Sequence, residues 1–273
     1  MTPSRTLAGL FFLLTMLATG PGGAAEIGGS LVIAGNGPEQ AMVETLAHAF
    51  EKAHPRAYVD VLWDDQSNPL EMVKTGQAHM AVTGLVHSGL ASAQIGWDGI
   101  GILVHLSNFT KDITQQQAAD IFSGKIREWS QLGGPDTTIL LIDRPRNHHI
   151  RDAFTSQLGI TEQVPDTAKT IGPDDQAVRT VVGTIPPLSA VTYISLNTGL
   201  SVVASGVAVR LLPVDKIEPE IPTVQDGRYR LRRPILLVSK PEAGALIKAF
   251  EQFALSAQGQ SIIGDTYIPL RNP

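Results

Sequence analysis

Short apolar runs alternate with segments of helical periodicity along most of this chain, and that alternation constrains the fold more than any other feature. Ser30–Ala34, Tyr58–Trp63 and Ala78–Val82 have the length and composition of strands. Between the first two runs, apolar residues recur at helical spacing from Met42 to Phe50. Strands that alternate with helices build mainly parallel sheets covered by helices. The sequence therefore predicts an α/β fold with a mixed, mainly parallel sheet flanked by helices.

The composition narrows the functional classes. The chain has 273 residues, of which 43% are hydrophobic, so it can bury the core of one large domain or of two modest lobes. Its formal net charge of −5 disfavours nucleic acid as the main partner, because that partner calls for a basic surface. The absence of cysteine excludes thiol catalysis, disulfides and cysteine-based metal sites.

Residues 1–25 have the features of a secretory signal peptide. Arg5 supplies a weakly positive start, Leu7–Ala18 an apolar run, and Gly23–Ala25 the small residues of a cleavage site. An uncleaved membrane anchor is the alternative, but an apolar run of about a dozen residues is short for a bilayer span. We expect cleavage before Glu26 and export to the periplasm.

The stretch Trp97–Arg151 carries the best candidate for a ligand site. It predicts a strand at Ile100–His105, a helix opened by Thr114, a second strand at Thr138–Ile142 and, just beyond, a helix at Asp152–Leu158. The loop after the second strand is basic and carries Arg144, His148, His149 and Arg151. Such a loop can present guanidinium and backbone N–H groups to an anion.

A family resemblance becomes visible in the same stretch. The pattern D-G-I-x-x-x-V is followed by I-T-x-x-Q-x-x-x-I-F-S-G-K-I-x-x-W-x-x-L-G-G. The matching residues are Asp98–Ile100, Val104, Ile113–Thr114, Gln117, Ile121–Ile126, Trp129 and Leu132–Gly134. This order resembles the substrate-binding proteins of ABC phosphate transporters, and the likeness extends more weakly from about Gly29 to the C-terminus.

The resemblance implies a two-lobed type II periplasmic-binding fold with a ligand cleft between the lobes. Lobe I would hold residues 26–105 and 231–273, and lobe II residues 106–230. The chain would be a monomeric, non-enzymatic solute-binding protein without a cofactor. It would deliver phosphate or a related oxyanion to an inner-membrane ABC permease.

The predicted ligand-binding residues come from loops that the fold would bring to the cleft. They are Asn36, Gly37, Gln66, Ser67, Thr83, Arg144, Asn147, His148 and His149. We expect Arg144 and its loop to face the other residues across the cleft. No metal ligand is expected.

This chain departs from the family at those loops. Asn36-Gly37-Pro38 stands where the relatives commonly carry hydroxyls after the first strand, and Asp65-Gln66-Ser67 where they usually carry Gly-Ser-Gly. Of their Arg-x-x-x-Ser-Gly-Thr loop only Arg144 remains. Imidazoles are bulkier than hydroxyls and donate from both nitrogens only when protonated. The ligand therefore stays open among phosphate, another oxyanion and a larger or less charged solute.

Several residues have a structural alternative to a ligand role. Arg144 could form an ion pair with Asp143 or Asp152. His148 and His149 could lie in a solvated loop, and chelation of a metal by the pair is disfavoured because neighbouring side chains of an extended loop point apart.

Two other functions remain open. The fold could serve as a sensor or interaction module that has lost phosphate binding. A hydrolase with His148 or His149 as its base is a third possibility, against which stands the absence of G-x-S-x-G or another nucleophile motif.

Overall fold

The structure is a computed structural model that describes residues 27–186 and 188–270, so the predicted signal peptide lies outside the described residues. The strands are β1 (Gly28–Gly35), β2 (Arg56–Trp63), β3 (Met80–Thr83), β4 (Ala91–His105), β5 (Leu140–Asp143), β6 (Lys169–Thr170), β7 (Ala190–Ser195), β8 (Val209–Leu212), β9 (Arg232–Ser239) and β10 (Ile268–Pro269). The helices are α1 (Gln40–Ala53), α2 (Pro69–Thr75), α3 (Gln115–Phe122), α4 (His149–Leu158), α5 (Asp174–Gly183), α6 (Leu196–Ala204), α7 (Ile221–Gln225), α8 (Ala245–Ala254) and α9 (Ala257–Gly264), with a 3-10 helix at Trp129–Leu132. Within residues 27–186 and 188–270, no helix combines the length and apolar character that a bilayer span requires.

The strands of the described residues form a mixed sheet in the order β2-β1-β3-β9-β4-β7-β5-β6. β1 is parallel to β2 and β3, and β5 is parallel to β6 and β7. β9 is antiparallel to both β3 and β4, and β4 is antiparallel to β7. The predicted mixed α/β fold is confirmed, with parallel pairing toward the two ends. The sheet of the described residues is not mainly parallel as expected, because β4 and β9 pair antiparallel with each other and with their other neighbours.

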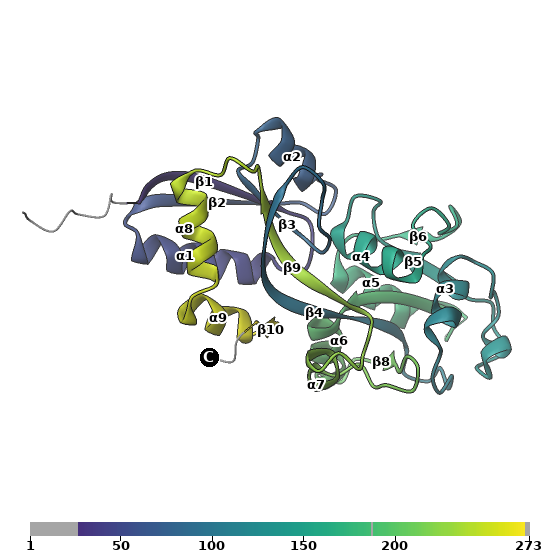
Figure 1. The fold of residues 1–273 in the computed structure, drawn as a ribbon. Coiled ribbons are helices and arrows are strands. Elements are labelled where there is room, and N and C mark those ends of the chain that lie inside the picture. The colour runs from purple at the N-terminus through teal and green to yellow at the C-terminus, as the bar shows by residue number, and fades with distance from the viewer. Residues whose placement is uncertain (1–26, 187, 271–273) are drawn as a thin grey trace, which may run out of the picture.

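The molecule has two lobes connected by the long strands β4 and β9, which cross from one to the other (Figure 1). Ile95 of β4 and Ile235 of β9 pack in a core with α1 and α8. Farther along, Ile100 of β4 and Leu231, just before β9, pack in a second core with α3 and α4. Within a few residues, β4 and the chain at β9 therefore pass from one hydrophobic core to the other. The exact residue bounds of the lobes stay a prediction.

Helix α3 begins where the sequence indicates. The Thr114 hydroxyl accepts from Gln117 N at 3.1 Å, and Thr114 N donates to Gln117 Oε1 at 2.7 Å. These reciprocal bonds are a capping box, which satisfies two otherwise unpaired donors. Trp129, a few residues on, is fully buried, and its indole donates to Ser189 O at 3.0 Å, so it is a packing residue.

Helix α4 begins earlier than predicted. The sequence indicated a start at Asp152, but the helix begins at His149, so His149 and Arg151 are helical. The N-cap residue is His148, which is not one of the residue types that usually cap a helix, and in the described part of the chain its side chain makes no cap hydrogen bond. The sequence therefore carried no capping signal at the true start of α4. The rings of His148 and His149 are nearly parallel, with an interplanar angle of 6° and centroids 5.7 Å apart, rather than pointing apart.

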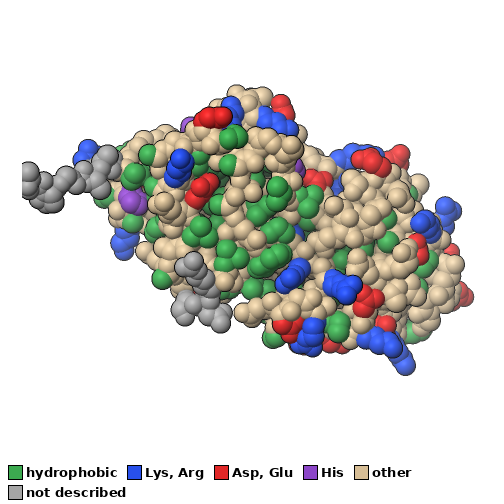
Figure 2. All heavy atoms as spheres, viewed as in Figure 1, with side chains coloured by type: hydrophobic (Ala, Val, Ile, Leu, Met, Phe, Trp, Pro, Cys, Tyr) green, Lys and Arg blue, Asp and Glu red, His purple; other side chains and the backbone are tan. Residues whose placement is uncertain are grey.

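Charged side chains of both signs are spread over the face drawn in Figure 2. Lys and Arg lie interspersed with Asp and Glu there, and apolar side chains gather over the lobe that contains β1, β2 and β3. Binding of an ion would therefore depend on local groups at a site rather than on a general field of one sign over this face.

Candidate functional site

The turn that follows β1 contacts the start of α4 across the two lobes. Asn36 Nδ2 donates to Asn147 O at 2.7 Å and to Ser67 O at 3.2 Å, and Asn36 Oδ1 accepts from His149 N at 3.3 Å. Asn147 Nδ2 in turn donates to Gln66 O at 2.9 Å and to Ser67 O. These predicted site residues are thus brought together, and their hydrogen bonds join the lobes directly.

Gly37 makes room for the groups packed over this turn. A Cβ at this position would lie 1.8 Å from His149 Nε2 and 2.6 Å from Glu39 Oε2, far inside contact distance. On the other side, Trp63 Nε1 donates to Gly37 O at 2.7 Å. Trp63 therefore holds the turn in place, and only glycine fits beneath the imidazole of His149.

A buried ionic cluster that the sequence analysis missed lies beside Gly37. Arg233 of β9 contacts Glu39 Oε1, Asp98 Oδ2 at 2.8 Å and His149 Nδ1 at 3.1 Å. His149 Nε2 lies 2.9 Å from Glu39 Oε2, and each of the four side chains is at most 5% exposed. The available signal was Arg233 itself, a charged residue in a strand that is otherwise largely apolar.

Arg233 contacts two carboxyl groups, those of Glu39 and Asp98, and their pKa values shift in opposite directions. Burial raises the pKa of Asp98 to about 7, against the attraction of Arg233. Burial also acts to raise the pKa of Glu39, but Arg233 and His149 together hold that pKa well below its ordinary value. Glu39 is therefore the ionised partner of Arg233 at neutral pH, and Asp98 is partly protonated.

Arg144 uses its guanidinium within lobe II. Its Nη2 lies 2.8 Å from Asp174 Oδ1 and donates to Tyr193 O at 2.9 Å, while Nη1 donates to Gly172 O at 2.7 Å. The ion-pair alternative is thus correct in kind, but its partners were wrong, because Asp143 pairs with Arg151 at 2.8 Å. Arg144 supports the cleft from behind through Asp174.

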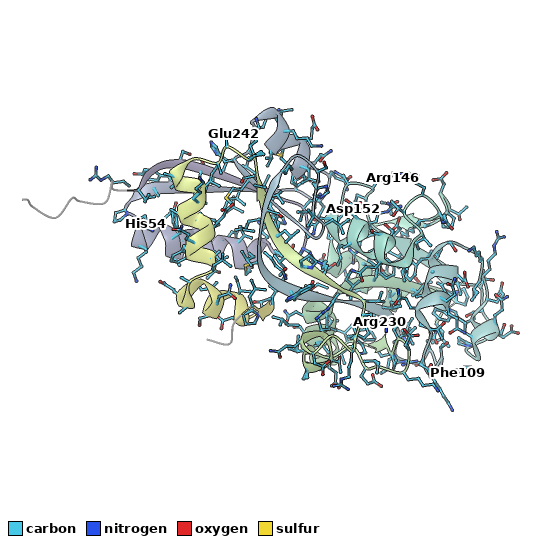
Figure 3. All side chains as sticks on the ribbon, in the orientation of Figure 1. His54, Phe109, Arg146, Asp152, Arg230 and Glu242 are labelled. Atoms are coloured by element: carbon cyan, nitrogen blue, oxygen red, sulfur yellow. The ribbon has the colours of Figure 1, made fainter. Side chains whose placement is uncertain are left out.

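Thr83 lies outside the hydrogen-bonded contact between the lobes. Its hydroxyl is 3.2 Å from His87 Nε2 and accepts from Leu85 N at 3.4 Å. Arg146, from the same loop as Arg144, lies at the surface of lobe II (Figure 3), and its side chain is 71% exposed and pairs with Asp166 at 3.2 Å. Neither residue reaches the Asn36–Asn147 contact through a bond that the described residues record.

A cavity of about 180 Å³ opens between the lobes next to this contact. It is lined by Gly37, Pro38, Asp65, His148, Gly172, Asp174 and Thr198. Asp174 begins α5 and Thr198 belongs to the first turn of α6, so the N-terminal ends of two helices form part of the wall. His148 is 2% exposed, and among the described residues its Nδ1 has no hydrogen-bond partner. The lining of the cavity therefore includes a histidine with one ring nitrogen unpaired within the described chain.

Comparison with known proteins identifies the fold family. Residues 20–258, most of the chain, match the family described as the PBP superfamily domain. The chain belongs to this superfamily. The resemblance noted in Trp97–Arg151 is thereby confirmed.

Named relatives of this PBP superfamily protein are binding proteins. It is 28% identical over 266 residues to the phosphate-binding protein PstS of Bacillus subtilis, which covers 91% of this chain and 83% of that protein. A candidate phosphate ABC transporter substrate-binding protein from Clostridium perfringens, crystallised with bound phosphate, superposes with a TM-score of 0.77 and 26% identity over 89% of this chain and 100% of that one. An ABC-type phosphate transport receptor from Vibrio cholerae shares the fold, with a TM-score of 0.76 and 24% identity over 88% of this chain and 100% of that one.

In this PBP superfamily member, burial pushes the cavity groups toward their neutral forms. Burial raises the pKa of Asp65, and the nearby Asp174 adds to the shift. Burial raises the pKa of Asp174 too, although Arg144 opposes it. Burial lowers the pKa of His148 well below its ordinary value, helped by His149 and Arg144. A ligand in this cavity meets two carboxyl groups and an imidazole, rather than a ring of fixed cations.

Two other possibilities lack support in the geometry. Across residues 27–186 and 188–270, no three His, Asp or Glu side chains are placed to hold a metal ion. A larger cavity of about 370 Å³ lies wholly in lobe II, where Arg127 is the charged residue among those that line it, together with Ser123, Ile139 and Pro165. The interlobe cavity is the better candidate because both lobes contribute polar groups to it.

Proposed function

We propose that this protein is an exported solute-binding receptor of an ABC importer that binds phosphate, or a closely similar protonated oxyanion, between its lobes. The observation that carries the proposal is the interlobe cavity, where Asp65 of one lobe and His148 and Asp174 of the other line a common space. The relatives named as phosphate-binding proteins support the same ligand class.

The charge pattern of the cavity favours an anion that brings its own proton. Two carboxyl groups, Asp65 and Asp174, line the space, and an ionised carboxylate can only accept hydrogen bonds. Hydrogen phosphate can donate its P–OH to one of them and accept at its other oxygens from the helix ends and from His148. A fully ionised oxyanion such as sulfate would leave oxygen lone pairs facing each other, which costs affinity.

The predicted residues take two different roles in this proposal. Gly37 and His148 contact the solute, together with Asp65, Asp174 and Thr198. Asn36, Gln66, Ser67, Asn147 and His149 hold the lobes in the closed arrangement. Thr83 and Arg144 act from farther away, Arg144 by orienting Asp174.

Lobe closure, export and delivery complete the proposal. Residues 26–105 with 231–273 would move relative to residues 106–230 about the crossing strands as the solute enters and leaves. The signal peptide would direct the chain to the periplasm, where a membrane permease receives the loaded form. No catalytic role is assigned to His148 or His149.

Isothermal titration tests the proposal. The mature protein, dialysed free of phosphate, would be titrated with phosphate, sulfate, molybdate and an organic phosphate at two pH values. We expect one-to-one binding of phosphate and at least tenfold weaker binding of sulfate. Absence of measurable phosphate binding at either pH would contradict the proposal.

A second candidate is a sensor or interaction module that has lost small-anion binding. One observation favours it: Asn36 and Asn147 bond directly to each other across the lobes. A protein of this kind would show no heat with any anion of the panel while remaining folded.

A further inference from the structure

The Glu39 carboxylate lies between His149 of lobe II and Arg233 of a crossing strand. Glu39 comes just before α1 in lobe I, and its side chain is fully buried. One of its oxygens contacts Arg233 on a crossing strand, and the other lies 2.9 Å from His149 Nε2 at the start of α4 in lobe II. A solute that closes a binding protein makes the same kind of contact with both lobes.

The protonation of His149 follows from its neighbours. A guanidinium can only donate hydrogen bonds, so His149 Nδ1, 3.1 Å from Arg233 Nη1, must be the accepting nitrogen. The ring proton then resides on Nε2, which lies 2.9 Å from Glu39 Oε2. Each carboxylate oxygen of Glu39 therefore lies beside a nitrogen from a different part of the chain.

The surrounding packing is shaped around this carboxylate. Gly37 has no side chain, and a Cβ there would collide with both His149 and Glu39. Tyr267 closes the turn from the C-terminal side by donating to Pro38 O at 2.9 Å. Removal of this buried carboxylate would leave Arg233 with Asp98 as its remaining carboxylate partner.

We propose that Arg233 and His149 form an anion subsite, that the Glu39 carboxylate fills it as an internal ligand, and that this contact keeps the lobes closed without a solute. The subsite suits a small carboxylate such as formate once Glu39 is shortened. The proposal goes beyond phosphate binding, because it concerns the protein with no solute present.

Small-angle scattering and thermal unfolding test the proposal in a buffer without phosphate or carboxylic acid. Wild type is compared with Glu39→Ala and with a control in the adjoining helix α1, Glu44→Ala, whose side chain bonds to Gln40 at the surface. We expect Glu39→Ala to have a larger radius of gyration and a midpoint lower by roughly 5 °C or more. Glu44→Ala should match wild type in both.

Formate provides the decisive addition. Formate is added in about tenfold steps up to a high millimolar concentration. It should restore the radius of gyration and the unfolding midpoint of Glu39→Ala, as expected for mass-action binding to the folded form. Sodium chloride at matched ionic strength should not do so. An unchanged radius in Glu39→Ala, or equal responses to formate and chloride, would overturn the proposal.

Glu39→Gln is a second variant that keeps the proposal testable if Glu39→Ala does not fold. It keeps the size of the side chain but not its charge, and its amide fills the space that formate would need. We expect it to open as the alanine variant does and not to respond to formate. A closed Glu39→Gln with wild-type stability would overturn the proposal. Phosphate titration of wild type is independent of all these measurements, so failure of the proposed function would be seen separately.

Discussion

Asp98 and Arg233 face each other on the two crossing strands, with Asp98 Oδ2 2.8 Å from Arg233 Nη2 and both side chains buried. They sit at the point where β4 and β9 pass from the core of one lobe to the core of the other. The ion pair therefore lies where the two lobes join. Through Glu39 and His149 it also reaches both lobes.

Replacing Arg233 should destabilise the protein strongly. Arg233→Met leaves Glu39 and Asp98 as buried carboxyl groups without their cation, and breaking a buried pair costs about 3–5 kcal/mol. Urea unfolding measures the loss. Arg230→Met, at an exposed position before β9 (Figure 3), is the control and should be within about 0.5 kcal/mol of wild type. Equal stability of the two variants would refute the role given to Arg233.

Gly37→Ala should disrupt the contact between the lobes. The new methyl group cannot fit 1.8 Å from His149 Nε2, so the imidazole or the whole turn must move. Overpacking of this kind costs about 1–3 kcal/mol. Gly183→Ala, in α5 with open space around its Cβ position, should be neutral or slightly stabilising because alanine favours the helix. Circular dichroism during urea unfolding compares the two, and a neutral Gly37→Ala would contradict the packing described for His149.

The free energy of unfolding should fall at acid pH because the buried His148 resists protonation in the folded state. Burial holds its folded-state pKa well below the ordinary value of 6.5. Above pH 6.5 the imidazole is neutral in both states; below it the unfolded chain binds the proton first, so stability falls as pH falls. The difference in unfolding free energy between wild type and His148→Gln, measured from pH 8 to pH 5, isolates this effect from the carboxyl groups. A difference that does not change with pH would contradict it.

Arg144→Ala should weaken both the fold and solute binding. The variant leaves the partly buried Asp174 without its cation and removes the bonds to Gly172 O and Tyr193 O. We expect at least tenfold weaker phosphate binding, about 1.4 kcal/mol, because Asp174 is no longer held at the cavity. Arg146→Ala, in the same loop but exposed, is the matched control. Titration at a temperature where both variants are folded compares them, and equal affinities would remove Arg144 from the account of the site.

Local sequence signals predicted the parts of this fold that local interactions determine. The α3 start was readable because the Thr114–Gln117 capping box acts within one helical turn. The apolar runs predicted the core strands because burial follows their composition. Helix α4 lacked such a signal, since His148 makes no side-chain cap in the described chain, and its start was misplaced.

The site depended on contacts between residues far apart in sequence. The loops containing Asn36, Ser67 and Asn147 were identified because each follows or precedes a regular element. Glu39 and Arg233 are 194 positions apart, and no periodicity links them. For Arg144 the sequence revealed the charge, but not that its two Nη nitrogens are already taken by Gly172, Tyr193 and Asp174.

The ratio of phosphate to sulfate affinity in wild type and in Asp65→Asn tests most directly whether the cavity selects an oxyanion that carries a proton. We expect wild type to prefer phosphate by at least tenfold, and Asp65→Asn to lose most of that preference because its amide can donate to sulfate. Asp60→Asn, on β2 outside the residues that line the cavity, should keep the wild-type ratio. Equal affinity of wild type for the two anions, or an unchanged ratio in Asp65→Asn, would contradict the account.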